Sequence, residues 1–295
     1  MLVTSAFPPF LACLLLTTPT LAQPEEPECP AGSTKVIINF DKLPDGSMAE
    51  AGEAANEQWE EVGVIFTGNR RLPKRGRQPS DPPPLRLFDS SDPTFDDYDL
   101  GSPNEACGFC DDSVLCPGVA THNKKAARET NCESQRNILI IDSGRPNPDD
   151  FRLGGLIDIK FTEPVPKILS LGAMDVQQPS VGVPRTTYNV WELNAGGVSK
   201  PGKPVQIEGL GDNTWQQIPI HHTGSITNIK IDVQGTFGLT HVRFCSELPH
   251  NLGDGDFVEA VSLTEPNKKP PGQPSNNAIP WILCWDELAM EYYRC

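Results

Sequence analysis

A run of aspartates in the first third of the chain carries the residue type best suited to bind a hard cation. Five aspartates fall within eleven residues, from Asp89 to Asp99, in a segment that also contains Pro and Gly. Unpaired carboxylates are too costly to bury, so this segment must be solvated, or neutralised by a cation or by basic groups. Oxygen ligands at this density suit calcium, although the spacing is not that of an EF-hand. An acidic, solvated loop without a ligand is the alternative.

Further aspartates lie at the ends of predicted strands or in loops, where several carboxylates can converge on one cation. We therefore predict calcium as a cofactor, with these ligands: Asp89, Asp97, Asp99, Asp149, Asp150 and Asp175. For each of them the alternative is a purely structural role, because aspartate often caps a turn through local hydrogen bonds. The calcium hypothesis requires that the loops holding these residues converge around one site.

Three aromatic residues could bind a sugar. Tyr188, Trp191 and Trp215 lie on or beside predicted strands, and lectin-like β-sandwich modules stack sugars on exposed aromatic rings. We therefore predict an extracellular polysaccharide or a matrix component as partner. The alternative is that these side chains are core residues, since aromatic rings contribute strongly to hydrophobic burial.

Signals for catalysis are weak. The sequence has no Gly-x-Ser-x-Gly elbow, no His-Glu-x-x-His and no phosphate-binding loop. Glu60-Glu61 and Asp149-Asp150 could supply the two carboxylates of a glycosidase, but adjacent acids are usually solvated. We assign no catalytic residue and predict a non-catalytic module, with a carbohydrate-active hydrolase or lyase as one alternative.

The composition is acidic, with 39 Asp plus Glu against 24 Lys plus Arg. This excess argues against nucleic acid as a partner. It fits an extracellular protein that meets cations, neutral glycans or mineral surfaces. A second alternative function follows from it, namely an acidic structural protein of a cell wall or of a biomineral matrix.

The first 22 residues have the pattern of a secretory signal peptide. They contain no charged side chain, and an apolar run at 10–16 leads to Thr20-Leu21-Ala22. The apolar run is too short for a stable membrane anchor, and no other stretch reaches the roughly 18 apolar residues that a span requires. We predict cleavage after Ala22, a secreted, extracellular protein, and no membrane span.

Cysteine usage agrees with an oxidising compartment. Of the nine cysteines, Cys13 lies in the leader, which leaves an even number and up to four disulfides. The predicted disulfide cysteines are Cys29, Cys107, Cys110, Cys116, Cys132, Cys245, Cys284 and Cys295. We expect a Cys29–Cys245 clasp and closure of the tail by Cys284 and Cys295. The four middle cysteines would constrain residues 90–136 with an undetermined pairing, and zinc bound at Cys107 and Cys110 is the alternative.

The sequence predicts short β-strands as the elements that position these residues. Period-2 alternation recurs between Gly, Pro, Asn or Asp, and we count about eleven such strands without helix–strand alternation. This predicts an all-β fold, an antiparallel two-sheet β-sandwich with a long disulfide-bearing loop and a short C-terminal tail. The predicted divisions are a signal peptide at 1–22, a β-sandwich domain at 30–246, a Pro-rich linker at 247–278 and a Cys-bearing tail at 279–295.

Several segments also resemble a group of secreted jelly-roll, galactose-binding-like β-sandwich domains. The similar segments are IINFDKLPDG at 37–46, WEEVGVIF at 59–66, LRLFD at 85–89, DYDLGSPN at 97–104, NILII at 137–141 and LSLGAMDV at 169–176. The resemblance spans about residues 35 to 245. It implies a jelly-roll-like sandwich and secretion, and little about function, because the group is mostly uncharacterised. The chain departs from the pattern in a basic insert at 69–77, at Ser143-Gly144-Arg145 and in its tail.

Overall fold

The computed structural model describes residues 28–71, 84–93, 97–107, 116–118, 130–180 and 184–247, together with the backbone of 283–286 and 291–294. The predicted signal peptide, the predicted linker from residue 248 on, Cys110 and Cys295 lie outside the described residues. The chain divides into two compact units, Met1–Val261 and Ser262–Cys295.

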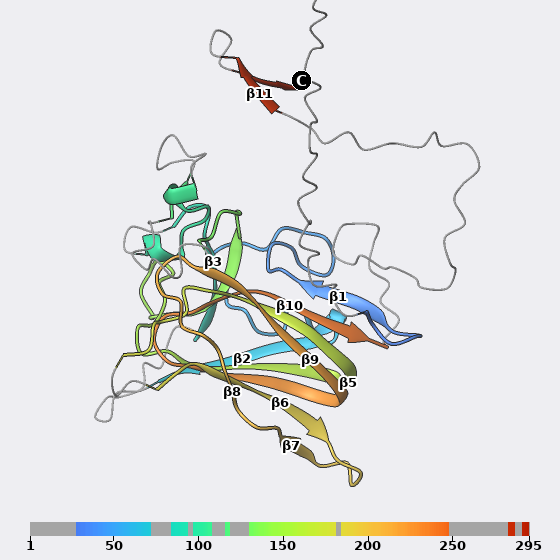
Figure 1. Ribbon diagram of the computed structural model, residues 1–295. Helices are drawn as coiled ribbons and strands as arrows, with labels where there is room; N and C mark the ends of the chain where they lie inside the picture. Colours follow the sequence, from blue (N-terminus) through green and yellow to red (C-terminus); the bar gives the residue numbers. More distant parts are fainter. Residues whose placement is uncertain are drawn as a thin grey trace, which may run out of the picture. The chain divides into compact units, whose positions relative to one another are not determined.

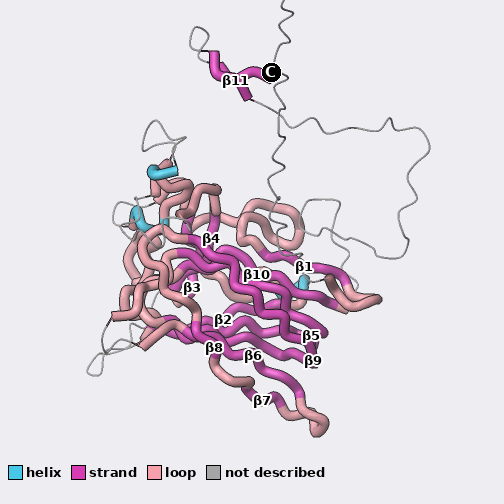
Figure 2. Tube along the Cα trace, in the orientation of Figure 1, coloured by secondary structure: helices cyan, strands magenta, loops and turns pink. Residues whose placement is uncertain are grey.

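The first unit is built on a ten-stranded antiparallel sheet (Figures 1 and 2). The helices of the described residues are three single 3-10 turns, η1 (Glu60–Val62), η2 (Tyr98–Leu100) and η3 (Glu105–Cys107). The all-β, antiparallel fold is therefore as predicted. The strands are β1 (Thr34–Ile38), β2 (Val64–Arg70), β3 (Leu85–Asp89), β4 (Asn137–Ile141), β5 (Gly155–Met174), β6 (Thr187–Leu193), β7 (Ser199–Pro201), β8 (Val205–Gln206), β9 (Trp215–Val233) and β10 (Gly238–Ser246).

The two longest strands, β5 and β9, organise the sheet. They pair with each other from Gly155 opposite Val233 to Met174 opposite Trp215. The first part of β5 also pairs with β2, and its later part pairs with β10. The resulting order is β3-β4-β10-β5-β9-β6-β7, with β1 on β10, β2 on β5 and β8 on β6.

The alternation at 156–161 and at 168–171 predicts two separate strands, and this is wrong because both belong to β5. Pro164 and Pro166 lie between the two segments. The register of β5 against β9 shifts between Lys160 and Val165 and again between Val165 and Lys167. Proline is tolerated at such bulges, where the ladder hydrogen bond is already lost, so the strand continues through them.

One hydrophobic cluster joins residues from both parts of the branched sheet. Ile157 and Ile159 from the first part of β5 belong to it, as does Leu171 from the later part, and all three are 0% exposed. The rings of Phe161 and Phe244 lie 5.0 Å apart between their centroids within this cluster. The alternating apolar residues of the strands therefore form the core, as period-2 patterning requires.

A second, smaller hydrophobic cluster anchors the acidic segment between β3 and β4, residues 90–136, which we call the excursion. Its buried members are Phe88, Leu100, Ile138, Ile140 and Met174. Leu100 is the last residue of η2 and is 0% exposed. Because this side chain is packed against β3, β4 and β5, the acidic residues on either side of it in the sequence are held at a fixed place beside the sheet.

Disulfides close both the sheet and the excursion. The expected Cys29–Cys245 bond joins the segment that precedes β1 to β10, and a Cys107–Cys132 bond lies in the long loop. Cys116 is disulfide-bonded as well. In the second unit β11 (Leu283–Asp286) pairs antiparallel with β12 (Glu291–Arg294); the expected Cys284–Cys295 bond lies outside the described residues. Among the described residues, no helix has the length and apolar character needed to cross a membrane.

Candidate metal centre

Six aspartates from four separate segments meet beside the sheet, and we call them the acidic centre. Its members are Asp97, Asp99, Asp149, Asp150, Asp175 and Asp212. The first two flank Tyr98 at η2, the next two precede β5, and the last two stand directly after β5 and three residues before β9. The convergence that the calcium hypothesis requires is therefore present for five of the six predicted ligands.

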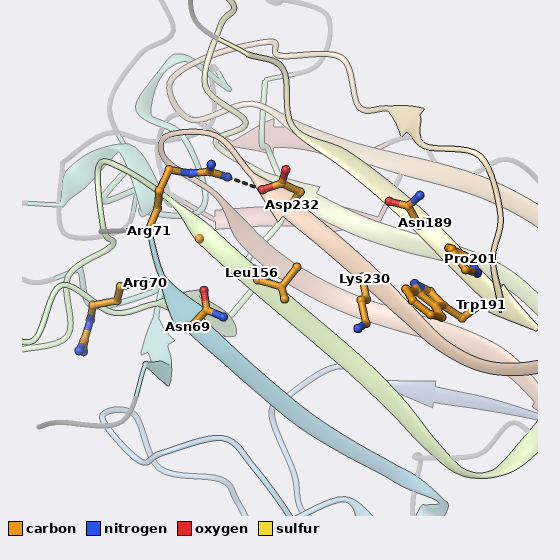
Figure 3. A pocket seen from close by; sticks show the side chains of 10 residues that line it. Asn69, Arg70, Arg71, Leu156, Asn189, Trp191, Pro201, Lys230 and Asp232 are labelled. Atoms are coloured by element: carbon orange, nitrogen blue, oxygen red, sulfur yellow. Dashed lines mark hydrogen bonds and ion pairs between the residues drawn. The ribbon is translucent and has the colours of Figure 1, made fainter. Parts of the chain in front are cut away.

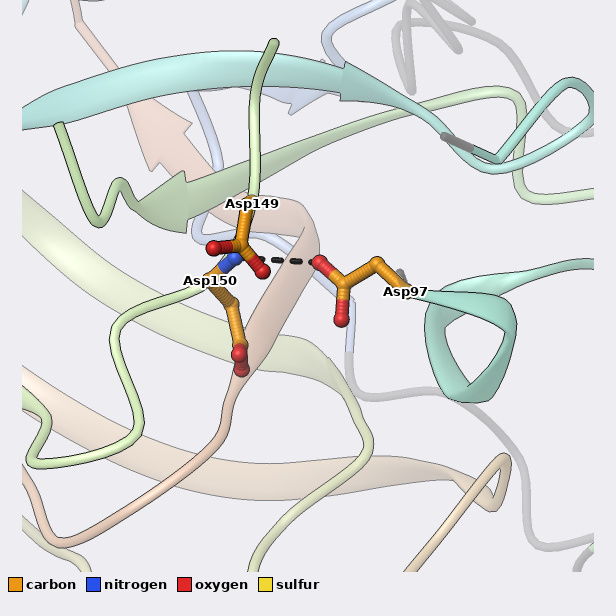
Figure 4. A group of neighbouring side chains, drawn as sticks. All are labelled: Asp97, Asp149 and Asp150. Atoms are coloured by element: carbon orange, nitrogen blue, oxygen red, sulfur yellow. Dashed lines mark hydrogen bonds between the residues drawn. The ribbon is translucent and has the colours of Figure 1, made fainter. Parts of the chain in front are cut away.

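The acidic centre consists of two adjoining triads. Asp97, Asp149 and Asp150 form the first, and Figure 4 shows their carboxylates gathered between η2 and the segment before β5. Asp99, Asp175 and Asp212 form the second. In each triad one carboxylate oxygen from every residue lies within 4.8 Å of the others. Two ligands on opposite sides of one calcium ion are separated by about 4.6–5.2 Å, twice the calcium–oxygen distance, so each triad has the dimensions of a coordination shell.

Backbone hydrogen bonds fix the first triad. The Asp150 N–H donates to Asp97 Oδ2 at 3.0 Å, and this bond links the excursion to the segment before β5 (Figure 4). The Phe237 N–H donates to Asp150 Oδ2 at 3.1 Å. These two bonds hold the segments that carry Asp97 and Asp150 against each other and against the residue before β10.

Asn213 fixes the second triad. Its side-chain amide donates to the Gly101 carbonyl, and its Oδ1 accepts from Asn104 Nδ2 at 2.7 Å. Its own backbone N–H lies 3.3 Å from Asp175 Oδ1. Asn213 is 0% exposed and has a φ of 51°, a left-handed conformation that Asn adopts more readily than most residues. One side chain thus ties the excursion to the turn that carries Asp212.

Asp175 is the most constrained member of the acidic centre. It is 1% exposed and has a left-handed φ of 52°. Its Oδ2 is buried without a hydrogen-bond partner among the described residues. A buried acceptor left unpaired costs about 1–3 kcal/mol, and a charged one costs more. The second triad therefore contains a carboxylate oxygen that no hydrogen-bond donor of the described residues satisfies.

Burial and mutual repulsion shift the pKa values of the acidic centre. Desolvation, followed by the charge of Asp150, raises the pKa of Asp97 to about 9. Desolvation and the charge of Asp99 raise the pKa of Asp150 to about 7. Burial also raises the pKa of Asp99, and it raises the pKa of Asp175 well above the ordinary value, with Asp99 and Asp150 adding repulsion. Near neutral pH the centre therefore holds protons unless a cation replaces them.

Asp142 shows how the same fold neutralises a buried carboxylate with basic groups. It is 0% exposed, and its oxygens lie 3.1 Å from Arg70 Nη2 and 3.6 Å from Arg86 Nη1. In the acidic centre the one ion pair among the described residues joins Asp149 to Arg145, whose side chain is 60% exposed. The other five carboxylates have no such pair within the described part of the chain, so no basic side chain of the described residues offsets the repulsion between them.

Asp89 and Asp212 mark where the sequence prediction and the geometry differ. Asp89 lies outside both triads, and its Oδ1 accepts from the Ser91 N–H at 2.9 Å, which is the turn-capping role given above as the alternative. Asp212 is a member that sequence reasoning missed. It stands alone in a Gly-Asp-Asn turn before β9, and only its position opposite the end of β5 brings it to the acidic centre.

The three predicted sugar-binding residues occupy different environments. Tyr188 is 5% exposed and belongs to the main core, so its ring is not available on the surface. Trp215 packs against the second cluster, and its Nε1 donates to Thr240 Oγ1 at 3.1 Å. Trp191 alone lines a groove on the sheet (Figure 3).

Comparison of the chain with protein-family models, with curated proteins and with solved structures found no match.

Proposed function

We propose that the chain is a secreted, non-catalytic extracellular module in which calcium, bound at the acidic centre, fixes the long excursion to the sheet. The observation that carries the proposal is the buried Asp175 carboxylate, whose Oδ2 has no hydrogen-bond partner among the described residues while Asp99 and Asp212 lie beside it. A cation at this point would pair with that oxygen and offset the repulsion within the centre.

The donor set favours calcium over other cations. All six side chains offer hard carboxylate oxygens, and neither triad includes His or Cys, which zinc prefers. Four separate segments supply the carboxylates, and calcium accepts six to eight oxygens in flexible geometry whereas magnesium demands a near-ideal octahedron. Calcium binding would displace the protons that the raised pKa values retain, so affinity would increase with pH.

The branched sheet supports the proposed fold, and the disulfides support the proposed compartment. We take the β2-β5-β9-β6 part and the β3-β4-β10-β5 part as the two layers of a jelly-roll-like sandwich, with β5 and β9 passing from one layer to the other at their bulges. Two disulfides, Cys29–Cys245 and Cys107–Cys132, support secretion, since such bonds persist in oxidising compartments.

The other functions considered fit the geometry less well. A matrix protein acting through acidity alone needs its carboxylates on the surface, whereas Asp97, Asp150 and Asp175 are buried. Raised pKa values also occur in acid–base catalysis. A hydrolase or lyase, however, needs a substrate groove at its carboxylates, and the groove on β2, β5, β9, β6 and β7 is lined by none of the residues of the acidic centre.

Thermal unfolding with and without calcium tests the proposal. At a calcium concentration 100 times the Kd, one bound ion stabilises the folded state by about 2.7 kcal/mol. A domain of this size gains about 2–4 °C in Tm per kcal/mol, so we expect a rise of about 5–11 °C that EDTA reverses. Magnesium at the same concentration is the control. An unchanged Tm across a calcium titration to millimolar concentration would exclude a structural calcium ion.

A further inference from the structure

The outer face of the sheet carries a groove that is separate from the acidic centre. Its volume is about 700 Å³, and it crosses β2, β5, β9, β6 and β7. None of its lining residues belongs to the acidic centre. The volume falls in the range of about 300–1,000 Å³ that is typical of small-molecule sites. Because its lining residues lie mainly on strands, a ligand bound in the groove would contact the sheet directly.

The sheet pattern explains why these side chains share one face. Tyr188 and Val190 point into the core, while Asn189 and Trp191, which alternate with them on β6, are less buried and line the groove. Lys230 on β9 stands opposite Asn189 in the antiparallel register. Figure 3 shows Trp191, Asn189 and Lys230 side by side along these strands.

The aromatic ring of Trp191 provides an apolar surface among polar groups. Lys230 Nζ lies 4.5 Å from the centroid of this ring, and Trp191 Nε1 is buried without a hydrogen-bond partner among the described residues. A pyranose ring has apolar C–H faces and a rim of hydroxyls, so it can contact an indole face and bond to neighbouring polar side chains. The long Lys230 side chain has to shift for a sugar to reach the ring.

The charges around the groove are paired. Arg71 binds Asp232 (Figure 3), and Lys230 Nζ lies 3.5 Å from Asp158 Oδ2. The Arg70 guanidinium points away from the groove to Asp142. Such pairs present donors and acceptors together with little net charge, which suits a hydroxyl-rich neutral ligand. The chain's net charge of −15 also disfavours approach of a polyanion.

We propose that this groove binds an uncharged polysaccharide chain, with a sugar ring stacked on Trp191 and its hydroxyls bonded to Asn189, Lys230 and the Arg71–Asp232 pair. The groove and the acidic centre share no residue, so this inference stands apart from the calcium proposal.

Affinity gel electrophoresis of the whole protein in calcium tests the inference. The neutral probes are mixed-linkage β-glucan, xyloglucan, arabinoxylan and galactomannan, and the acidic probes are polygalacturonate and alginate. We expect retardation by at least one neutral polymer and by neither acidic one. Failure of all four neutral polymers to retard the protein, or retardation by acidic polymers only, would overturn the inference.

Variants then locate the site. Trp191→Ala should weaken binding by about tenfold or more, and Asn189→Ala by about threefold or more, when each variant is measured below its own Tm. Lys160→Ala, an exposed residue of β5 outside the groove, is the matched control and should bind as the wild type does. Asp175→Asn should bind polysaccharide normally below its Tm, which separates this site from the acidic centre. Wild-type binding by Trp191→Ala would refute the assignment.

Discussion

Replacing Asp175 by Asn should have opposite effects on stability with and without calcium. Asn keeps the shape of the side chain and the acceptor for the Asn213 N–H, which lies 3.3 Å from Asp175 Oδ1. Its amide nitrogen, in place of the Oδ2 that has no hydrogen-bond partner within the described part of the chain, can donate to Asp99 or Asp212. The variant thereby removes a group whose pKa is raised by burial first and by Asp99 and Asp150 next.

The magnitude in the metal-free protein follows from proton linkage. An aspartate with an unperturbed pKa of 3.8 that must take up a proton on folding loses about 1.4 kcal/mol of stability per pH unit above that value. The upper limit at pH 7 is therefore about 4 kcal/mol, and recovery of half of it raises Tm by about 4–8 °C. In calcium the variant lacks a ligand, and we expect at least about a tenfold loss of calcium affinity.

Differential scanning calorimetry in EDTA and in calcium measures both effects, and isothermal titration gives the Kd. Asp142→Asn is the matched control, because this buried carboxylate is paired with Arg70 and Arg86 instead of other acids. It should lose about 3–5 kcal/mol in both conditions. The reasoning is refuted if Asp175→Asn lowers Tm equally in EDTA and in calcium, or if its calcium affinity is unchanged.

Three further predictions concern the same region. The metal-free protein should lose stability as the pH rises from about 4 through 7 and towards 9, because the pKa values of Asp150 and Asp97 are raised in the folded state to about 7 and about 9. The calcium-induced rise in Tm should therefore be larger at pH 8 than at pH 5. An equal rise at both pH values would contradict this reasoning. Asn213→Ala should lower Tm in both conditions and weaken calcium binding, since it removes the bonds to Gly101 and Asn104; unchanged calorimetric and titration curves would count against it. The Cys107–Cys132 disulfide closes a loop of 25 residues, and replacing both cysteines with Ser should lower the free energy of unfolding by about 3 kcal/mol. Urea unfolding measures this loss, and peptide mapping checks that the Cys29–Cys245 bond stays intact.

Local pattern was sufficient for the strands but not for their lengths. The alternation of apolar and polar residues located segments of β1 to β6 and of β8 to β10, because one buried face imposes a period of two. It could not show that 156–161 and 168–171 form one strand. Pro164 and Pro166 interrupt the alternating pattern in the sequence, and only the bulged pairing with β9 makes these prolines compatible with a continuous β5.

The sequence likewise predicted some members of the acidic centre and not others. Their residue type and density in the sequence pointed to a cation, and five of the six predicted ligands meet at the acidic centre. Asp89 has the same local context as the others, but its position at the end of β3 directs it to Ser91. Asp212 has no acidic neighbour in sequence and joins the centre because β9 begins where β5 ends, with Trp215 opposite Met174.

Sequence alone thus determined that this chain forms an all-β fold and that its loops carry clustered carboxylates, because both depend on spacing within a few residues. It also led us to expect those carboxylates in solvent or neutralised. Only the tertiary structure decided that Asp97, Asp150 and Asp175 are buried together while Asp142 is paired with two arginines. Burial depends on contacts between segments far apart in the chain, and it is burial that turns an acidic sequence into a site with a need for a cation.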